Sequence, residues 1–155
     1  VVTGFSRFDL LGTGQADLYY QTVLKMIGKE ILVELLDTFH DLDLKAQKNY
    51  KPSILTEALH SEILASGKLG PIARNIIKLW YTATWEKLPD QWREQFGASV
   101  DHSIFIPSPY IPSPYAYPEG LVWRAVGVNP PGAKAPGYGT WSEAPSVKLT
   151  TTNNS

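Results

Sequence analysis

Residues 17–40 read DLYYQTVLKMIGKEILVELLDTFH, and apolar side chains return at every third or fourth position of this stretch. That spacing is the period of an amphipathic helix. Four residues carry the pattern: Leu24, Ile27, Ile31 and Leu35. Gly28 lies inside it at a cost of about 1 kcal/mol relative to alanine, so we interpret it as a close crossing with another helix. The sequence therefore predicts a long first helix, followed by a polar connection over residues 41–51.

The same period continues through the middle of the chain and predicts further, shorter helices. They are expected at residues 53–66, 71–85, 90–96 and 118–126. Pro71 and Pro118 would each lie at a helix start, where proline is favoured because its missing N–H has no partner there. No stretch alternates as a strand would. The prediction is an all-α fold, a small helical domain of three to five helices with a long extended C-terminal arm.

Composition sets limits on the class of protein. The chain has 155 residues and a net charge of −1, which suits one domain and argues against a nucleic-acid or anionic-membrane surface. No run of eighteen apolar residues is present, so no membrane span is expected. Cysteine is absent, which removes disulfides and thiolate chemistry.

The arm is defined by proline and tyrosine. Nine of the twelve prolines and four of the eight tyrosines follow Ile106, and the string IPSPY occurs at residues 106–110 and again at 111–115. Proline fixes φ and removes a backbone donor, so this segment cannot join a central sheet or a long helix. We expect residues 1–100 to form the helical domain and residues 101–155 to form a partner-wrapping arm with one short helix, both within a single structural unit. A polyproline ligand for an aromatic groove is a rival interpretation.

No constellation of residues predicts chemistry in this chain. The three histidines have no ligand at metal-binding spacing, and no serine lies in a Gly-x-Ser-x-Gly elbow. The glycines of Gly12-Thr13-Gly14 follow no strand, so a turn explains them better than a dinucleotide loop. We expect no catalytic, cofactor-binding or metal-binding residue here, and therefore no enzyme activity in the chain by itself.

Aromatic residues are the candidate partner-binding groups, because tryptophan and tyrosine are enriched at binding hot spots. Trp80, Tyr81 and Trp85 are too close together in sequence for all of them to face one core. Trp80 is therefore assigned to the core. Tyr81 and Trp85 either lie at the surface or between helices, or contact a partner. The predicted partner-binding residues are Trp80, Tyr81, Trp85, Tyr110, Tyr115, Tyr117, Leu121, Trp123, Tyr138 and Trp141.

Several strings resemble a known family. YPEGLVWRAVG at residues 117–127, NPPGAKAPGYGTW at 129–141 and EAP at 143–145 are similar to the C-terminal region of the small subunits of the sorbitol dehydrogenase family. IARNIIKLWYTATW at residues 72–85 and, more loosely, FSRFDLLGTG at residues 5–14 are similar to earlier parts of those subunits. The doubled IPSPY string is not part of the family pattern.

The resemblance implies a non-catalytic accessory subunit that holds no cofactor. Such a subunit binds a large catalytic subunit of the glucose-methanol-choline type, which carries FAD and oxidises a sugar or alcohol. It helps that subunit mature and reach the periplasm through a twin-arginine signal, which the sequence here lacks and which we expect to have been removed. In many such complexes a multi-haem cytochrome c subunit accepts the electrons, and the assembly is associated with the membrane.

A second hypothesis comes from a different class of protein. The chain would be an independent extracytoplasmic helical binding protein whose arm closes over a small sugar-like or apolar ligand. Solubility separates the two hypotheses, because an obligate subunit expressed alone would expose a large apolar patch and aggregate.

Overall fold

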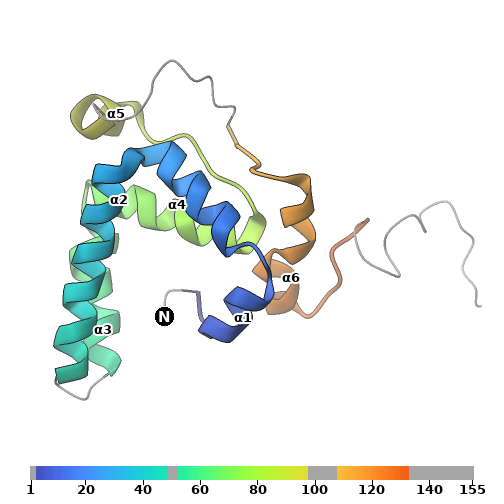
Figure 1. Ribbon diagram of the computed structural model, residues 1–155, viewed down its shortest axis with the longest axis horizontal. Coiled ribbons are helices and arrows are strands. Elements are labelled where there is room, and N and C mark those ends of the chain that lie inside the picture. Colours follow the sequence, from blue (N-terminus) through green and yellow to red (C-terminus); the bar gives the residue numbers. More distant parts are fainter. Residues whose placement is uncertain (1–2, 49–51, 98–107, 133–155) are drawn as a thin grey trace, which may run out of the picture.

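The computed structural model describes residues 3–48, 52–97 and 108–132, which fold almost entirely as helices (Figure 1). Over these residues no strand is present, and the all-α prediction is confirmed with six α-helices. In chain order the elements are α1 (Arg7–Gly12), α2 (Ala16–Lys48), α3 (Pro52–Ala58), the π-helical turn η1 (Leu59–Leu64), α4 (Leu69–Thr82), α5 (Asp90–Phe96), the 3-10 turn η3 (Pro114–Glu119) and α6 (Leu121–Val126).

The first long helix is bent at its glycine. Gly28 has φ 76° and ψ 165°, a backbone conformation that is essentially restricted to glycine, and α2 changes direction there (Figure 1). The backbone conformation is thus by itself a sufficient reason for a glycine at this position. The expectation that residues 41–51 form a connection is wrong, since α2 continues to Lys48. Leu42 and Ala46 extend the buried face to the end of the helix.

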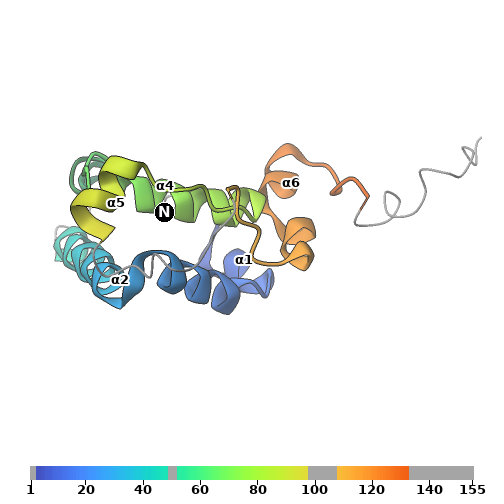
Figure 2. The ribbon, with the colours of Figure 1, turned by 90° about the horizontal axis from the view of Figure 1, so that it is seen from above.

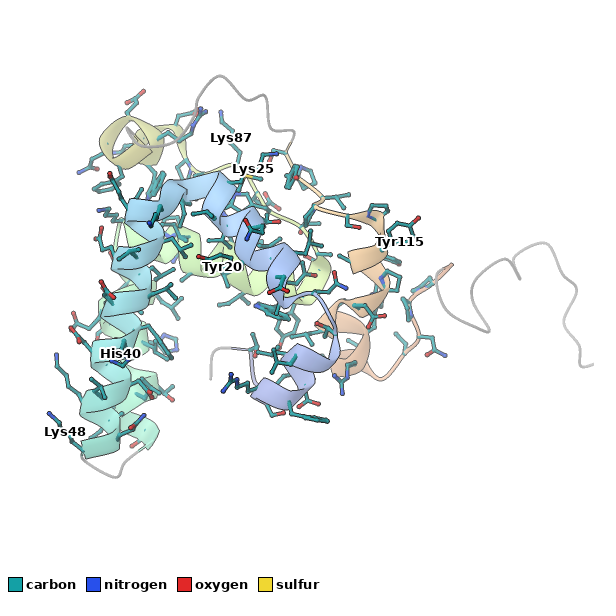
Figure 3. All side chains as sticks on the ribbon, in the orientation of Figure 1. Tyr20, Lys25, His40, Lys48, Lys87 and Tyr115 are labelled. Atoms are coloured by element: carbon teal, nitrogen blue, oxygen red, sulfur yellow. The ribbon has the colours of Figure 1, made fainter. Side chains whose placement is uncertain are left out.

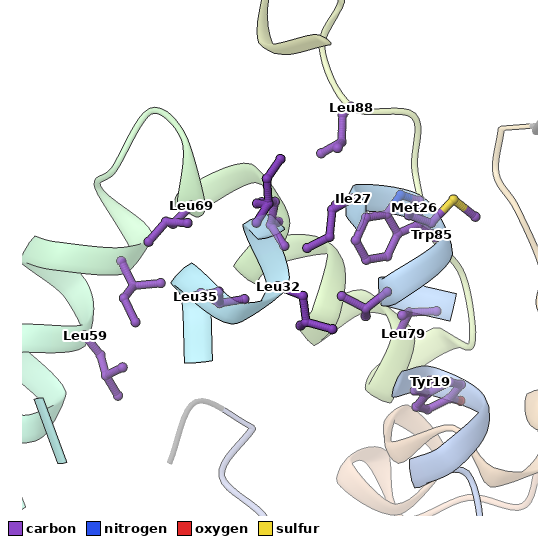
Figure 4. Packing of buried hydrophobic residues seen from close by; sticks show 14 of the residues in the cluster. Tyr19, Met26, Ile27, Leu32, Leu35, Leu59, Leu69, Leu79, Trp85 and Leu88 are labelled. Atoms are coloured by element: carbon purple, nitrogen blue, oxygen red, sulfur yellow. The ribbon is translucent and has the colours of Figure 1, made fainter. Parts of the chain in front are cut away.

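The helices form two layers, with α2 in one and α3, α4 and α5 in the other (Figure 2). The half of α2 before the bend contributes Tyr19 and Ile27 to the core, while the half after it packs on α3 and η1. Figure 4 shows Leu35 near Leu59 at one end of this core and Tyr19 at the other. Because the bend lets one helix cover both α4 and the α3–η1 segment, a single core forms.

The predicted helix over residues 53–66 is present but divides into α3 and a π-helical turn. In that turn Ala65 donates its N–H to the His60 carbonyl at 2.9 Å, one residue further back than in an α-helix. The next helix begins against this turn. A Cβ on Gly70 would lie 2.6 Å from the Leu64 carbonyl oxygen, so only glycine allows the approach.

The end of α4 differs from the prediction that it reaches Trp85. The helix ends at Thr82, and Ala83 adopts the left-handed conformation with φ 55°, which turns the chain back toward the core. Asn75 is buried and holds the returning segment at Glu86. Its Nδ2 donates to the Glu86 carbonyl at 3.2 Å, and the Glu86 N–H donates to its Oδ1 at 2.9 Å.

The described part of the arm folds back onto the helical domain. The N–H groups of Trp85 and Tyr110 each donate to the other's carbonyl, at 2.9 and 2.7 Å, forming an isolated antiparallel bridge. Farther along, α6 packs against α4, and Leu121 is completely buried. A Cβ on Gly120 would lie 2.7 Å from the carbonyl oxygen of Tyr81, so the arm comes into backbone contact with the end of α4.

Candidate partner interface

Of the three aromatic residues at and just after the end of α4, Trp80 and Trp85 pack in the same core, so the placement of Trp85 at the surface or between helices is wrong. Trp80 packs edge-on against Tyr19 at a ring distance of 5.0 Å. Trp85 is only 2% exposed, so in this conformation its ring is not available to a partner. Tyr81 is half-buried, and its hydroxyl donates to the Thr3 carbonyl at 2.7 Å. The turn at Ala83 explains the difference, because it reverses the direction in which Trp85 points.

Tyr110 also lies on the chain's own helices. Besides its backbone pairing with Trp85, its ring is half-buried and receives the Lys25 ammonium 5.2 Å from the ring centroid (Figure 3). This first tyrosine of the doubled IPSPY string therefore helps attach the arm to α2. Tyr115, the second, is 84% exposed and projects from the outer edge of η3.

Trp123, Tyr117 and Leu121 form a small unit that closes the arm on itself. The Trp123 indole N–H donates to the Tyr117 carbonyl at 2.8 Å, and the two rings meet edge to face at 5.1 Å. The Tyr117 hydroxyl donates to the Pro131 carbonyl at 3.3 Å. Leu121 fixes the unit on α4, so of the three only Tyr117 and Trp123 retain surface for a partner. Tyr138 and Trp141 lie outside the described residues.

Helix α1 was not predicted from the sequence, and it presents two apolar side chains to solvent. Phe8 is 85% exposed and Leu11, one turn later, is 55% exposed. No residue of α1 is buried, so this helix is not formed by packing its apolar face on the domain. Instead, a capping box stabilises the start of the helix. The Ser6 side chain accepts a hydrogen bond from the Asp9 backbone N–H, and the Asp9 side chain accepts one from the Ser6 backbone N–H, each at 3.1 Å.

A charged pair ties α1 to the arm. Arg124 of α6 donates to the Asp9 carboxylate at 3.0 Å, and its guanidinium lies 5.7 Å from the ring centroid of Phe5. Hydrogen bonds from Ser6, followed by the charge of Arg124, lower the pKa of Asp9 below its usual value. The carboxylate thus remains ionised at neutral pH and keeps α1 beside α6.

The exposed apolar residues of α1, η3 and α6 gather at one end of the molecule, which we call the α1–α6 end (Figures 1 and 2). Its members are Phe8, Leu11, Tyr115, Tyr117, Val126 and Val128. Aromatic residues that remain exposed on a folded protein are typical anchors of protein interfaces. The α1–α6 end is therefore the strongest candidate interface.

One buried polar group lies close to this end. The Tyr19 side chain is 3% exposed, and its hydroxyl finds no hydrogen-bond partner among the described residues. Burial, and secondarily the negative charge of Glu119, raise the pKa of Tyr19 to about 12. The phenol therefore remains neutral at every physiological pH, and its ring serves as packing between α2 and Trp80.

No cluster of three or more histidine or acidic side chains within residues 3–48, 52–97 and 108–132 has the geometry to hold a metal ion. None of the described helices is both long and apolar enough to cross a bilayer. His40 and His60 are exposed, and His102 lies outside the described segments.

No family model, curated protein or solved structure matches this chain. The likeness to sorbitol dehydrogenase small subunits consequently rests on the quoted strings alone.

Proposed function

We propose that this chain is the non-catalytic small subunit of a periplasmic FAD-dependent sugar or alcohol dehydrogenase complex. It would bind and stabilise a catalytic subunit of the glucose-methanol-choline type and assist its maturation and twin-arginine export. FAD would belong to that partner, and haem c to a cytochrome subunit where one is present. The strings at residues 72–85 and 117–145 suggest the family, and the exposed surface of the fold supports a role in binding.

The observation that carries the proposal is the state of α1. A six-residue helix is too short to be stable alone in water, yet α1 is capped and tied to α6 while Phe8 faces outward. An ordered helix with an exposed phenylalanine is already shaped to enter an apolar pocket. Ordering before binding lowers the entropy lost on association, which favours a stable complex.

The partner surface is defined by what the α1–α6 end presents. It would offer an apolar pocket for Phe8 and Leu11 and a flatter apolar area for Tyr115. We expect the whole interface, including the arm, to bury above roughly 2,000 Å² in total, the size of obligate assemblies.

Copurification from the native host tests the proposal. A tagged chain should bring down a large subunit with flavin absorbance, and the chain alone should have neither flavin nor dehydrogenase activity. Phe8→Ala and Tyr115→Ala should each lower the yield of complex by about tenfold, the effect of a modest hot spot. The matched control is Tyr20→Ala, which removes a tyrosine that is 51% exposed on α2, and should leave the yield unchanged.

Two outcomes would overturn the proposal. One is a purified assembly with no flavoprotein. The other is an isolated chain that is monomeric and soluble and binds a small sugar, which would favour the independent binding protein.

A further inference from the structure

The half of α2 after the bend is apolar on two opposite sides. Ile31, Leu35 and Leu42 are buried on the side that packs on α3 and η1. The other side faces solvent and carries three large apolar residues. The first two are three positions apart, and the third follows eight positions later, with His40 midway between the second and the third (Figure 3). We call this side the α2 outer face; its apolar members are Val33 at 44%, Leu36 at 50% and Leu44 at 41% exposure.

This pattern differs from that of an ordinary surface helix. A helix that packs on one side of a domain normally carries polar and charged residues on its other side. Residues 33, 36, 40 and 44 lie on one helix face because they are separated by three or four positions. Phe39, which is 38% exposed, widens the apolar surface toward the core side.

The charges along the middle of the α2 outer face are of one sign, while the exposed lysines Lys29, Lys45 and Lys48 lie at its two ends. Residues 30–44 contain five carboxylates and neither lysine nor arginine. They are Glu30, Glu34, Asp37, Asp41 and Asp43. Lys68 pairs with Glu34, and the Gln47 amide donates to Asp43 at 2.7 Å. Glu30, Asp37 and Asp41 are exposed along the border of the apolar stripe.

A second copy of the chain fits this face poorly. In an antiparallel pair of α2 helices centred on His40, Leu36 would oppose Leu44 of the other copy, which is favourable. The same symmetry would bring Asp37 of each copy close to the other copy's Asp41 and Asp43, and like charges at such positions repel. The acidic border equally disfavours an anionic lipid surface.

We propose that the α2 outer face is a docking site for a protein surface with an apolar centre and a border of lysine and arginine. It lies on the half of α2 that leads away from α1 and α6, so it is separate from the α1–α6 end (Figure 1). The inference depends on the apolar stripe of α2 and on its acidic border, which is complementary to a basic partner surface. It does not depend on whether the partner at the α1–α6 end is a flavoprotein.

Two designed helical peptides test the proposal with the full-length chain. Both carry the same leucine stripe, but one has lysines along its border and the other has glutamates. We expect fluorescence anisotropy to show the lysine peptide binding at least about tenfold more tightly at low salt, with the difference shrinking as salt rises. Leu36→Ser combined with Leu44→Ser should weaken that binding about tenfold. Because both residues are about half exposed, the melting temperature should fall by only a few degrees and the chain should stay folded. Tyr20→Ala is the matched control.

Charge reversal supplies the second variant. Asp37→Lys combined with Asp41→Lys should make the chain prefer the glutamate peptide. Equal affinity for the two peptides, or binding that survives the double serine variant, would overturn the proposal. So would a dimer in light scattering that the serine variant dissociates, since a second copy would then be the occupant. Tighter peptide binding by a Tyr138→Ala/Trp141→Ala chain would also overturn it, because the chain's own C-terminal segment would then cover the face.

Discussion

Replacing Asn75 tests how the helical domain holds the arm. This buried side chain makes both backbone hydrogen bonds of Glu86, one residue beyond Trp85. Trp85 in turn pairs with Tyr110, the first described tyrosine of the arm. Loss of the asparagine amide should therefore loosen the segment that follows α4 and, through the bridge, the attachment of the arm.

The expected cost follows from the contacts. A hydrogen bond within a protein contributes a net of about 0.5–1.5 kcal/mol, so two contribute about 1–3 kcal/mol. Glu86 is exposed, so water can replace part of what its backbone loses. Truncation also leaves a small void where the amide was buried, which raises the cost again. We expect Asn75→Ala to lower the free energy of unfolding by about 2–3 kcal/mol.

Urea unfolding followed by tryptophan fluorescence measures this loss. Thr82→Ala on the same helix is the control. The exposed Thr82 hydroxyl donates to the Lys78 carbonyl at 2.9 Å and lies 2.7 Å from the Thr84 hydroxyl, where water can replace both contacts, so its effect should stay within about 0.5 kcal/mol. Hydrogen exchange supplies a second readout. The Tyr110 amide, which donates to the Trp85 carbonyl at 2.7 Å, should exchange faster in Asn75→Ala.

Asn75→Asp separates the hydrogen bonds from the loss of volume. The aspartate can still accept from the Glu86 N–H but, when ionised, places a buried charge against the Glu86 carbonyl. Burial should raise its pKa in the folded state, so the destabilisation should be largest above that pKa and shrink as the pH falls and the carboxyl becomes a donor. The reasoning fails if Asn75→Ala unfolds like the wild type, or if Tyr110 protection is unchanged.

Three further substitutions test other positions of the fold. Gly28→Ala should lower the free energy of unfolding by about 1–3 kcal/mol because alanine is strained at φ 76°, whereas Gly67→Ala, which meets open space, should have little effect; urea titration compares them. Gly120→Ala should destabilise the chain and speed proteolysis of the arm, since its Cβ would lie 2.7 Å from the Tyr81 carbonyl oxygen. Tyr19→Phe should keep or raise stability at pH 7, because it removes a buried hydroxyl without a partner among the described residues. Between pH 10 and about 12 the Tyr19 phenol ionises in the unfolded state but not in the folded state. The free energy of unfolding of the wild type should therefore fall by up to about 1.4 kcal/mol per pH unit in this range, and alkaline titration should show no such loss for Tyr19→Phe.

The helices were predictable because their apolar spacing is a local property of the sequence. The five predicted segments all correspond to helical structure, including the short α5 at Asp90–Phe96. The boundaries were less predictable where a single conformation decides them. The left-handed turn at Ala83 is an example, since alanine is a good helix former and its spacing gives no sign of a stop. The bend at Gly28 likewise depends on which of several conformations a permissive glycine adopts.

The candidate interface was less predictable, because exposure depends on long-range packing. Leu121 and nine aromatic residues were predicted as partner anchors, but Leu121 and Trp85 are buried within the chain itself. The most exposed of the large apolar residues in the described segments, Phe8, instead lies in α1. A usable signal was present there, since Ser6 and Asp9 have capping-box spacing and Phe8 and Leu11 lie one turn apart. Whether such a helix buries its apolar side is decided by elements more than a hundred residues away.

In the proposed complex the arm would therefore have two physical roles that its composition alone does not separate. Tyr110, Leu121 and Trp123 are used within the chain, where they attach residues 108–132 to α2 and α4 and hold η3 against α6. Tyr115 is left exposed beside a helix that Arg124 keeps in place. An arm that was only a wrapping segment would have to be ordered by its partner at the full entropic cost. An arm that is already ordered over part of its length has met that entropic cost during folding. In the proposed complex, more of the contact energy of Tyr115 and α1 would then remain for binding.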